Sequence, residues 1–393
     1  MSATGPPQPF RQVLLKIHSR CNLACDHCYV YRSADQSWRN RPVIMARQTI
    51  DRTAARMAEH ARAHHLSWMQ VVLHGGEPLL AGPELISYAV RAIRSAAPTH
   101  TEIRFSVQTN GLLLDTEFLD LFVRHGINVG VSLDGGQAAN DLHRVFADGR
   151  GSYHHVALAL RLLSQEPYRS CYSGLLCTVD TRNDPVRVYT DLLAFSPPQI
   201  DLLLPHGNHS TTPPGRPSDM TTSAYSGWLI AMFDRFYSAP RRETRIRLFE
   251  SIIDQLLGLP SRSEVLGLDP VVLVTVETDG ALEQGDALKT VAHGAATTGL
   301  HIETHSLDDA LAHPGIRIRQ GGLLVLSPTC QSCPLVRVCG GGHYAHRYRV
   351  GKGFAHPSVY CPDLFALISH IHKRLYSDLR VQLKAADPPM PVG

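Results

Sequence analysis

Three cysteines lie close together near the start of the chain, in the stretch CNLACDHCYVY. Cys21, Cys25 and Cys28 have the spacing C-x3-C-x2-C, and the next cysteine along the chain is far away. Three thiolates on one short loop can hold three irons of a [4Fe-4S] cube and leave the fourth iron open to an external ligand. A closed zinc site needs a fourth protein ligand, for which His18 and His27 are the nearby candidates. The spacing favours the cluster, with a substrate as its fourth ligand.

Four more cysteines gather in the last quarter of the chain. Their spacing is C-x2-C-x5-C, followed by a fourth cysteine after twenty-one residues, and they are Cys330, Cys333, Cys339 and Cys361. Four thiolates close a site completely, so this set predicts either a structural zinc site or a fully ligated [4Fe-4S] cluster. The remaining two cysteines, Cys171 and Cys177, have no metal-like partners in the sequence and are predicted to be structural.

Strand and helix patterns alternate from residue 12 to about residue 205 and must position these cysteines. Strands are expected at 13–19, 69–75, 102–109, 127–134, 173–180 and 200–206. Asp115 and Gly126 can cap the two ends of one intervening helix, and Asp184-Pro185 can begin another. Repeated units of this spacing predict an α/β fold with parallel strands in a complete or partial barrel. Functional loops of such barrels follow the carboxyl ends of the strands, which is where the first cysteine loop lies.

The strand–helix alternation stops after His206, in the loop GNHSTTPPGRPSDM. Helices are expected near 222–238 and 245–258, and a β-hairpin at 271–284 with Asp279-Gly280 at its turn. The predicted organisation is an N-terminal tail at 1–11, a partial barrel at 12–264 that includes an insertion at 207–264, a cysteine-rich unit at 265–380, and a loose tail at 381–393.

Composition limits the classes of partner. The chain has 393 residues, 44% of them hydrophobic, which suits one large core and a smaller one. The formal net charge is +3 and the basic residues are scattered, so no nucleic-acid partner is expected. We find neither a signal peptide nor an apolar run of about 18 to 20 residues, so no membrane partner is expected and a cytoplasmic location is predicted. In a reducing cytosol, clustered cysteines are metal ligands more often than disulfides.

The C-x3-C-x2-C loop resembles the signature of the radical SAM superfamily, in which S-adenosyl-L-methionine (SAM) chelates the open iron. HGGEP at 74–78, QTNG at 108–111 and SLDG at 132–135 end three successive predicted strands and fit the same resemblance. It implies a set of SAM contacts from Gly75, Gly76, Glu77, Asn110, Ser132 and Arg144. In this set, Glu77 would accept a hydrogen bond from the amino group of SAM and Arg144 would pair with its carboxylate. Taken singly, these residues are typical of turns.

The second cysteine set, behind such a barrel, resembles the SPASM extension of this superfamily, whose full form carries two auxiliary iron-sulfur clusters. Two ligand positions of the other auxiliary cluster are occupied here by Gly285 and His343. We therefore expect two [4Fe-4S] clusters in the chain, one that binds SAM and one auxiliary cluster on the four late cysteines. Asp286 follows the lost cysteine, where the resemblance implies a carboxylate that accepts a substrate proton. The alternative is an exposed hairpin aspartate.

Longer stretches, including IDLLLPHGN and CGGGHYAHRY, resemble the FxsB-type, cyclophane-forming maturases of ribosomally made peptides. This resemblance implies cleavage of SAM to a 5′-deoxyadenosyl radical, abstraction of a Cβ hydrogen from a precursor peptide, and formation of a crosslink between side chains. The partners would be the precursor peptide and an external electron donor. The first strand begins too early for a winged leader-binding domain, so a separate leader-binding protein, an exposed sheet edge or the 207–264 insertion would recognise the leader.

Other functions stay open at the level of the sequence. A sulfatase-maturing enzyme that forms formylglycine shares the same first half-reaction, as do enzymes that form thioethers or epimerise residues. Outside this chemistry, the chain could be a zinc-stabilised, non-catalytic binding module, or an electron carrier that binds clusters but not SAM. Iron content and the release of 5′-deoxyadenosine separate these classes.

Overall fold

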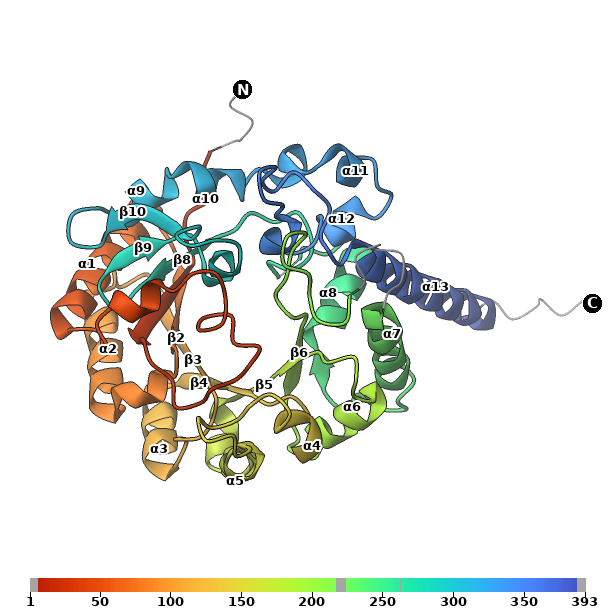
Figure 1. Ribbon diagram of the computed structural model, residues 1–393, viewed down its shortest axis with the longest axis horizontal. Helices are drawn as coiled ribbons and strands as arrows, with labels where there is room; N and C mark the ends of the chain where they lie inside the picture. The colour runs from red at the N-terminus through yellow and green to blue at the C-terminus, as the bar shows by residue number, and fades with distance from the viewer. Residues whose placement is uncertain (1–5, 217–223, 262, 387–393) are drawn as a thin grey trace, which may run out of the picture.

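Alternating strands and helices build a curved sheet with helices on its outer side (Figure 1). The structure is a computed structural model that describes residues 6–216, 224–261 and 263–386, with side chains up to residue 379. The strands are β1 (Gln12–His18), β2 (Trp68–Gly75), β3 (Glu102–Thr109), β4 (Ile127–Ser132), β5 (Tyr172–Thr178), β6 (Gln199–Leu203), β7 (Arg245–Ile246), β8 (Leu273–Val276), β9 (Ala281–Glu283) and β10 (Thr297–His301). In space their order is β10-β9-β8-β1-β2-β3-β4-β5-β6-β7.

The helices mostly connect consecutive strands. The α-helices are α1 (Arg47–Ala63), α2 (Pro83–Ala96), α3 (Thr116–His125), α4 (Gln137–Asn140), α5 (Tyr153–Leu163), α6 (Pro185–Leu193), α7 (Ala224–Tyr237), α8 (Arg247–Leu256), α9 (Leu307–Leu311), α10 (Pro314–Ile318), α11 (Pro328–Gln331), α12 (Val336–Cys339) and α13 (Cys361–Ala386). Short 3-10 helices are η1 (Ser37–Asn40), η2 (Pro78–Ala81), η3 (Tyr168–Cys171), η4 (Asp286–Thr290), η5 (Gly322–Val325) and η6 (Tyr344–Arg347).

The predicted α/β class with a partial parallel barrel is confirmed. Strands β1 to β6 are all parallel to their neighbours, and each begins within one residue of its predicted start. Strand β6 ends three residues earlier than predicted because Pro205 has no N–H with which to continue the ladder. Cys171 and Cys177 lie buried in the apolar core of this barrel.

The predicted helix ends are also present. The Asp115 side chain accepts a hydrogen bond from the Phe118 N–H at the start of α3, and Gly126 ends that helix in the left-handed conformation. Asp184 caps α6 in the same way, and Pro185 occupies its first turn. These local signals set where each crossover helix begins and ends, and therefore which strand end each following loop leaves from.

The cysteine-rich part of the chain joins the same sheet. The predicted hairpin is found as β8 and β9, which pair antiparallel around a turn that contains Gly280. The sequence did not indicate that β8 also pairs in parallel with β1. Strand β7 likewise extends the other end of the sheet beside β6, and α8 packs on β6. One sheet and one apolar core therefore cross the boundary predicted near residue 265.

Both predicted tails differ from the structure within the described residues. Phe10 is fully buried in the core, and the Arg11 N–H donates to the Val272 carbonyl, so the end of the 1–11 segment is packed. At the other end, α13 continues through Ala386, because the last turns carry good helix formers, and the predicted loose tail cannot begin at residue 381. Residues 387–393 lie outside the described residues. None of the described helices has the length and apolar content that crossing a membrane requires.

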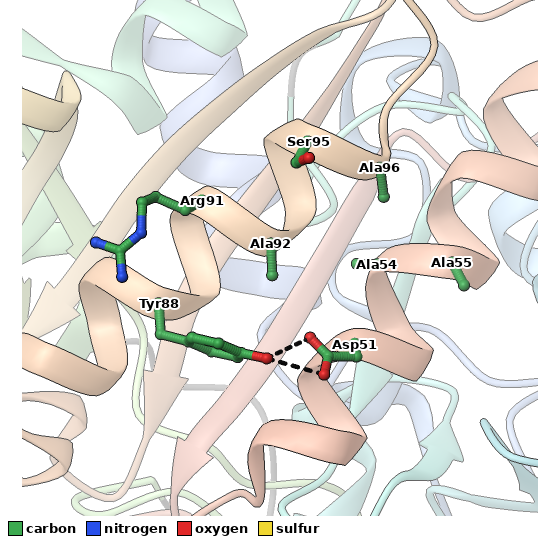
Figure 2. A pocket seen from close by; sticks show the side chains of 8 residues that line it. All are labelled: Asp51, Ala54, Ala55, Tyr88, Arg91, Ala92, Ser95 and Ala96. Atoms are coloured by element: carbon green, nitrogen blue, oxygen red, sulfur yellow. Dashed lines mark hydrogen bonds between the residues drawn. The ribbon is translucent and has the colours of Figure 1, made fainter.

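A shallow depression lies on the outer side of the barrel, between α1 and α2 (Figure 2). Tyr88 points towards α1, and its hydroxyl donates to both carboxylate oxygens of Asp51, at 2.7 and 2.8 Å. Alanines line most of the rest of the depression, and no cysteine lies in it. It is formed by two helices and not by the carboxyl ends of the strands, so we do not assign chemistry to it.

A buried ion pair fixes the start of α13. The Asp363 carboxylate pairs with Arg216 and also accepts a hydrogen bond from the Ser226 N–H at 3.0 Å. Both charged side chains are almost completely buried, at 1% and 0% exposure. Helix α13 packs against α7 and α8, so this pair joins the cysteine-rich part of the chain to the barrel.

We expect Asp363→Asn to lower the free energy of unfolding by about 3 to 5 kcal/mol, because it leaves the Arg216 charge buried without its partner. Urea unfolding followed by circular dichroism measures the change. The control is Asp234→Asn, which removes a half-exposed contact between α7 and His370 of α13. That control should change the free energy by no more than about 1 kcal/mol. Equal losses in the two variants would contradict the importance of the buried pair.

Candidate active site and metal centres

The loop that carries Cys21, Cys25 and Cys28 leaves the end of β1 and is attached to its neighbours by backbone hydrogen bonds. The N–H groups of Gly76 and Glu77, just after β2, donate to the carbonyls of His18 and Arg20, both at 2.9 Å. Further along, the Ala24 N–H donates to the Val145 carbonyl at 2.8 Å. In Figure 1 this loop lies on the inner side of the arc of strands. The three thiols are therefore placed at the carboxyl end of the sheet, as predicted.

Glycines are required where β2 meets this loop, because the loop backbone and Tyr31 approach them closely. A Cβ on Gly75 would overlap the carbonyl oxygen of His18, and Gly75 has φ +151°. A Cβ on Gly76 would overlap the Tyr31 hydroxyl and the Arg20 carbonyl. The space that the two glycines leave is filled by the cysteine loop itself. Contact between these glycines and SAM stays a prediction.

Glu77 holds the ends of β2 and β3 together. Its side chain is buried, and its carboxylate accepts hydrogen bonds from the Leu79 N–H at 3.0 Å, the Thr109 hydroxyl at 2.7 Å and the Asn110 N–H at 2.8 Å. Burial raises the pKa of Glu77 to about 7, although these donors oppose the shift. The carboxylate is thus occupied by protein groups, and its predicted bond to the SAM amino group is not tested by the structure.

Two other predicted SAM contacts lie at neighbouring strand ends. The Asn110 side-chain amide lies 3.6 Å from the Cys21 sulfur and donates to the Asn22 side chain at 2.8 Å. Ser132, at the end of β4, accepts a hydrogen bond from the Gln108 side chain at 3.2 Å. The structure therefore brings Asn110 directly to the cysteine loop and places Ser132 one strand further along the sheet.

Arg144 forms a bidentate ion pair inside the protein. Its Nε and Nη2 donate to the two carboxylate oxygens of Asp134, at 2.7 and 3.1 Å. Burial opposes the charge of Arg144, but the Asp134 carboxylate outweighs it and raises the pKa of the guanidinium. Arg144 also lies close enough to Cys25 to lower the pKa of that thiol. The pair places a positive charge beside the first cysteine loop, while the predicted bond to the SAM carboxylate is not tested.

The thiols of the first loop are suited to binding an iron-sulfur cluster. Burial, together with neighbouring thiols in the loop, raises the pKa of Cys21 to about 12 and that of Cys25 to about 11. The Leu23 N–H donates to the Cys21 sulfur at 3.4 Å, which favours a negatively charged sulfur. Thiols with raised pKa values are protonated near pH 7, and metal binding releases their protons. The loop therefore suits three ligands of an iron-sulfur cluster.

The second cysteine set is assembled from two short helices, a turn and the start of the long helix α13. Cys330 lies in α11, Cys339 ends α12, and Cys361 begins α13, while the Cys333 N–H donates to the Cys330 carbonyl at 3.1 Å. Burial, together with Cys361 and Cys330, raises the pKa of Cys339 to about 12. Cys333 and Cys330 act on Cys361 in the same way. Cys361 therefore acts electrostatically together with each of the other three thiols, which suits one closed four-thiolate site.

Arg347 places a positive charge beside this second site. Its guanidinium donates to the carbonyls of Gly340, Gly341 and Gly342 in the turn after Cys339, at 2.6 to 3.2 Å. The Cys330 and Cys339 thiols raise the pKa of this buried arginine, although burial lowers it more. A cluster with four thiolates carries negative charge, so a fixed cation beside it fits the assignment.

The positions of the second auxiliary cluster contain an arginine. A Cβ on Gly285 would lie 3.3 Å from the Arg319 guanidinium, and the charge of Arg319 lowers the pKa of His343. Arg319 donates to the Gln284 carbonyl at 2.6 Å and pairs with Glu264 at 3.3 Å. A cation between the two substituted positions supports the prediction of one auxiliary cluster.

Asp286 is not an exposed hairpin residue, so that alternative is wrong. It begins η4 with 6% of its surface exposed, because the chain turns inward after β9. Its carboxylate pairs with Lys16 of β1, and the Tyr29 hydroxyl donates to it at 3.1 Å. Burial alone would raise the pKa of Asp286, but Lys16 and Lys289 outweigh burial and hold it well below its usual range. Asp286 is therefore ionised.

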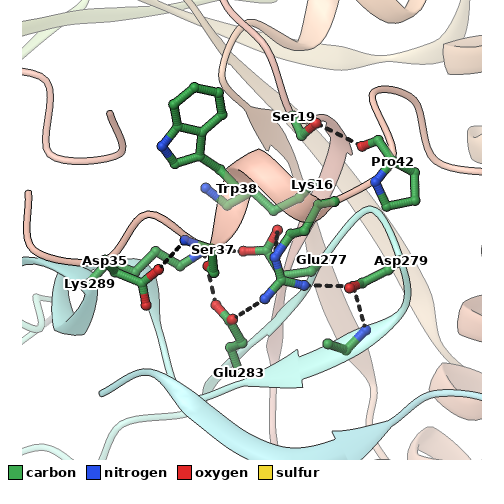
Figure 3. A network of polar contacts seen from close by, with 12 residues as sticks. Lys16, Ser19, Asp35, Ser37, Trp38, Pro42, Glu277, Asp279, Glu283 and Lys289 are labelled. Atoms are coloured by element: carbon green, nitrogen blue, oxygen red, sulfur yellow. Dashed lines mark hydrogen bonds and ion pairs between the residues drawn. The ribbon is translucent and has the colours of Figure 1, made fainter. Parts of the chain in front are cut away.

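Asp286 belongs to a larger buried network, part of which Figure 3 shows. The Lys289 ammonium lies among three carboxylates, pairing with Glu277, with Glu283 at 3.0 Å and with Asp286 at 3.8 Å. Arg41 pairs with Glu283 and Asp279, both at 2.6 Å. Burial, together with Glu277, raises the pKa of Glu283 to about 7. The carboxylates could group around a metal ion, but the lysine already fills that position.

The sequence analysis missed this network. The one available signal was Lys16, a charged residue inside the otherwise apolar strand VLLKIH. A lysine in a buried parallel strand requires a partner, because an unpaired buried charge is strongly unfavourable. Its partner lies 270 residues away, and the spacing of residues alone cannot identify it.

The barrel region is similar in sequence to a known family. Residues 15–192 match the sequence model of the radical SAM superfamily. The serine-type anaerobic sulfatase-maturating enzyme of Klebsiella aerogenes is 34% identical over 159 residues, which are 40% of this chain and 38% of that enzyme. The chain thus spans about two fifths of the length of this curated relative, and the same holds for the corresponding enzyme of Klebsiella pneumoniae, at 39%.

Solved structures resemble nearly the whole chain. Native anSMEcpe with bound AdoMet has a TM-score of 0.79 and 22% identity, over 93% of this chain and 98% of that chain. Streptococcus suis SuiB bound to the precursor peptide SuiA has a TM-score of 0.59 and 12% identity, over 90% of this chain and 76% of that chain. At these identities the likeness concerns the fold, including the arrangement that follows the barrel.

We expect Glu77→Gln to lower the free energy of unfolding by about 1 to 3 kcal/mol, because a glutamine amide turns a donor towards one of the three donors that Glu77 now satisfies. The pKa of about 7 adds a pH dependence. A raised acid pKa stabilises the fold at low pH, and this stabilisation is lost as pH rises from about 4.5 to about 7. The difference between wild type and variant should therefore be larger near pH 5 than near pH 8.

Urea unfolding at the two pH values measures this difference. Glu102→Gln serves as the control, because the Glu102 side chain makes an exposed ion pair with Arg104 at the start of β3. It should change the free energy by no more than about 1 kcal/mol at either pH. A Glu77→Gln variant as stable as the wild type at both pH values would show that the carboxylate does not hold β2 to β3.

Proposed function

We propose that this chain is an enzyme that modifies a peptide by radical chemistry, because residues 15–192 match the sequence model of the radical SAM superfamily. The observation that carries the proposal is the three-cysteine loop, fixed at the carboxyl end of the sheet with Asn110 and Arg144 beside it. A [4Fe-4S] cluster with SAM would supply the ability to remove a hydrogen atom from an unactivated C–H bond. The protein has to hold the chosen C–H bond in place and exclude water.

The residues proposed to hold these groups follow the sequence analysis. Cys21, Cys25 and Cys28 would ligate the SAM-binding cluster, and Cys330, Cys333, Cys339 and Cys361 the auxiliary cluster. SAM would be bound by Gly75, Gly76, Glu77, Asn110, Ser132 and Arg144. The engagement of Glu77 and Arg144 with protein groups supports a role in shaping the SAM site as much as in direct contact.

A peptide substrate is supported by the proteins that this chain resembles. The Klebsiella aerogenes relative is a sulfatase-maturating enzyme, and SuiB has been solved with its precursor peptide SuiA. We propose that the reaction here is removal of a Cβ hydrogen from a precursor peptide, followed by formation of a cyclophane-type crosslink to a nearby side chain. The resemblance of IDLLLPHGN and CGGGHYAHRY to the cyclophane-forming maturases supports this choice.

Crosslinking removes two hydrogen atoms from the peptide. One would leave as an atom, taken up by the radical chemistry that bound SAM would supply and appearing in 5′-deoxyadenosine, and the other would leave as a proton and an electron. The site therefore needs a proton acceptor and an electron acceptor. The four late cysteines would hold the electron acceptor, since their closed ligation leaves no position for substrate. The electron that starts each turnover would come from an external donor.

Asp286 is the proposed proton acceptor. It is ionised, and its Oδ1 makes no hydrogen bond within the described residues, while Oδ2 is held by Lys16 and Tyr29. Its lowered pKa makes it a weak base, which is sufficient for an oxidised aromatic radical because that species is a strong acid. Fixed by two partners, the carboxylate does not have to reorganise when it takes the proton.

Sulfatase maturation is the second candidate, favoured by the names of the curated relatives and by the likeness to anSMEcpe. Oxidation of serine to formylglycine also removes two hydrogen atoms, so the mass of the product does not distinguish it from a crosslink. An aldehyde reacts with hydroxylamine and a crosslink does not. Fragmentation of the product peptide adds a second criterion, because a crosslinked ring resists cleavage between its ends.

We expect the reconstituted enzyme, with SAM and a reductant, to form a crosslinked peptide from a short precursor encoded beside its gene. Cys25→Ala should form neither 5′-deoxyadenosine nor product, because one ligand of the SAM-binding cluster is lost. Cys333→Ala should still cleave SAM but lose the crosslink. Chromatography with mass spectrometry measures both products, and Cys171→Ala is the control, since that thiol lies in the apolar core.

Different results overturn different parts of the proposal. Absence of 5′-deoxyadenosine from the reconstituted wild type, with iron loaded, would end the radical SAM assignment. A product that reacts with hydroxylamine would show that the enzyme forms formylglycine and not a crosslink. Undiminished crosslinking by Cys333→Ala would make the auxiliary site structural only.

We expect Asp286→Asn to lower the ratio of crosslinked product to 5′-deoxyadenosine by tenfold or more. Positioned proton transfer typically contributes about 10² to 10⁴ to a reaction rate, so a tenfold loss is a cautious minimum. The ratio is the measure, because loss of the Lys16 partner also lowers stability and total activity. Glu283→Gln is the matched control, since it disturbs Lys289 and Arg41 in the same network without touching Tyr29. A normal ratio in Asp286→Asn would dismiss the role.

A further inference from the structure

Three histidine rings meet between the end of the barrel and the second cysteine set. His206 follows β6, while His343 and His346 lie at the start of and within η6, more than a hundred residues later. The ring centroids are 5.8 Å apart for His206 and His343, 5.6 Å for His206 and His346, and 5.0 Å for His343 and His346. One nitrogen of each ring lies within 4.8 Å of one nitrogen in each of the other two.

Two nitrogens of this histidine cluster are buried without a hydrogen-bond partner among the described residues. They are Nδ1 of His206 and Nε2 of His346, and the His346 side chain belongs to a residue only 4% exposed. A buried polar atom without a partner is costly and uncommon, and its usual explanation is a bound water or ion. Two such atoms in one group of imidazoles indicate a missing shared ligand.

We propose that His206, His343 and His346 bind a divalent transition-metal ion of the zinc type, with at least one coordination position left open. Imidazole nitrogens are preferred ligands of such ions, and three protein ligands with an open position are typical of reactive zinc sites. Nitrogens on one zinc ion lie roughly 3.3 Å apart, given bonds of about 2.0 to 2.1 Å, so small ring rotations close the site. Imidazoles without thiolates are poor ligands for an iron-sulfur cube, which sets this site apart from the cysteine sites.

The protonation of the three rings is compatible with this proposal. Burial lowers the pKa of His206 to about 4 and lowers the pKa values of His343 and His346 well below the usual range. The rings are therefore neutral near pH 7, as metal ligation requires. His343 accepts a long hydrogen bond at Nδ1 from the Ala345 N–H, 3.3 Å, which ligation through Nε2 would break. Loss of this bond would weaken metal binding.

Charges around the cluster are mixed. Arg319 and Arg347 both act on His343, but Arg319 is paired with Glu264, and Arg347 is beside the thiols of the second cysteine set. The Asp286 carboxylate acts on His206 in the opposite sense and favours a cation there. The two arginines oppose a metal ion and the carboxylate attracts it, which again predicts moderate affinity.

The aromatic rings around the histidine cluster place it between the two cysteine sites. The Tyr29 ring contacts the His206 ring edge to face, with centroids 5.1 Å apart, and the Tyr29 hydroxyl donates to Asp286. On the other side, the Tyr360 ring contacts His346 at 5.1 Å, next to Cys361. An ion here would lie between the two cysteine sites, and its open position would take an oxygen ligand such as a water or a peptide carbonyl.

The experiment measures zinc on the untagged, full-length chain after anaerobic reconstitution, with iron content confirming that the cysteine sites are loaded. Equilibrium dialysis against zinc chloride, followed by elemental analysis, should give one zinc per chain for the wild type. His206→Gln and His346→Gln should each weaken zinc binding by tenfold or more. His209→Gln should bind as the wild type does, because His209 bonds to the Pro357 carbonyl outside the cluster.

X-ray absorption at the zinc edge identifies the ligands. Nitrogen neighbours at about 2.0 to 2.1 Å with imidazole scattering are expected, whereas sulfur at about 2.3 Å would mean that zinc occupies a cysteine site and would overturn the proposal. No zinc uptake by the wild type, or equal uptake by all variants, would overturn it as well. Unchanged iron content and circular dichroism show that each variant is folded. The test does not depend on SAM cleavage, so it stands apart from the proposed function.

Discussion

The close approach of the end of β2 to the first cysteine loop is the contact on which the candidate site depends. Two backbone hydrogen bonds join Gly76 and Glu77 to His18 and Arg20, and the glycines leave no room for a side chain between them. Because β1 and β2 are parallel neighbours, this contact fixes the position of the cysteine loop relative to the carboxyl ends of both strands. Glu77 then extends the same attachment to β3 through Thr109 and Asn110. The cysteine loop is thus firmly attached to the carboxyl end of the sheet.

Much of the barrel follows from local signals. Strand starts, helix caps at Asp115 and Asp184, and the glycine stop at Gly126 depend on residues that are neighbours in the chain, so the sequence indicates them directly. The first cysteine loop and its position after β1 were predictable for the same reason. The end of β6 was placed too late, because its apolar run continues to Leu204 although its pairing does not.

Contacts between distant segments were beyond the sequence. The pairing of β8 with β1 and the bond from Lys16 to Asp286 both join segments more than 250 residues apart. Neither has a periodic pattern, since a short strand such as β8 and a single buried charge are each compatible with many partners. The histidine cluster is similar, because His206 meets His343 and His346 only after the chain has passed through α7, α8 and the sheet. The sequence could point to His343 as a substituted position but not to its neighbours.

The place of β1 in the sheet has a consequence for the architecture of the chain. Strand β1 pairs with β2 on one side and with β8 on the other, and β8 belongs to the cysteine-rich part of the chain. Without residues 265 to 393, the backbone groups of β1 that face β8 would be unsatisfied, and an apolar strand would become an open sheet margin. Such a margin attracts strands from other molecules. The later part of the chain therefore completes the sheet beside β1, and the barrel depends on it.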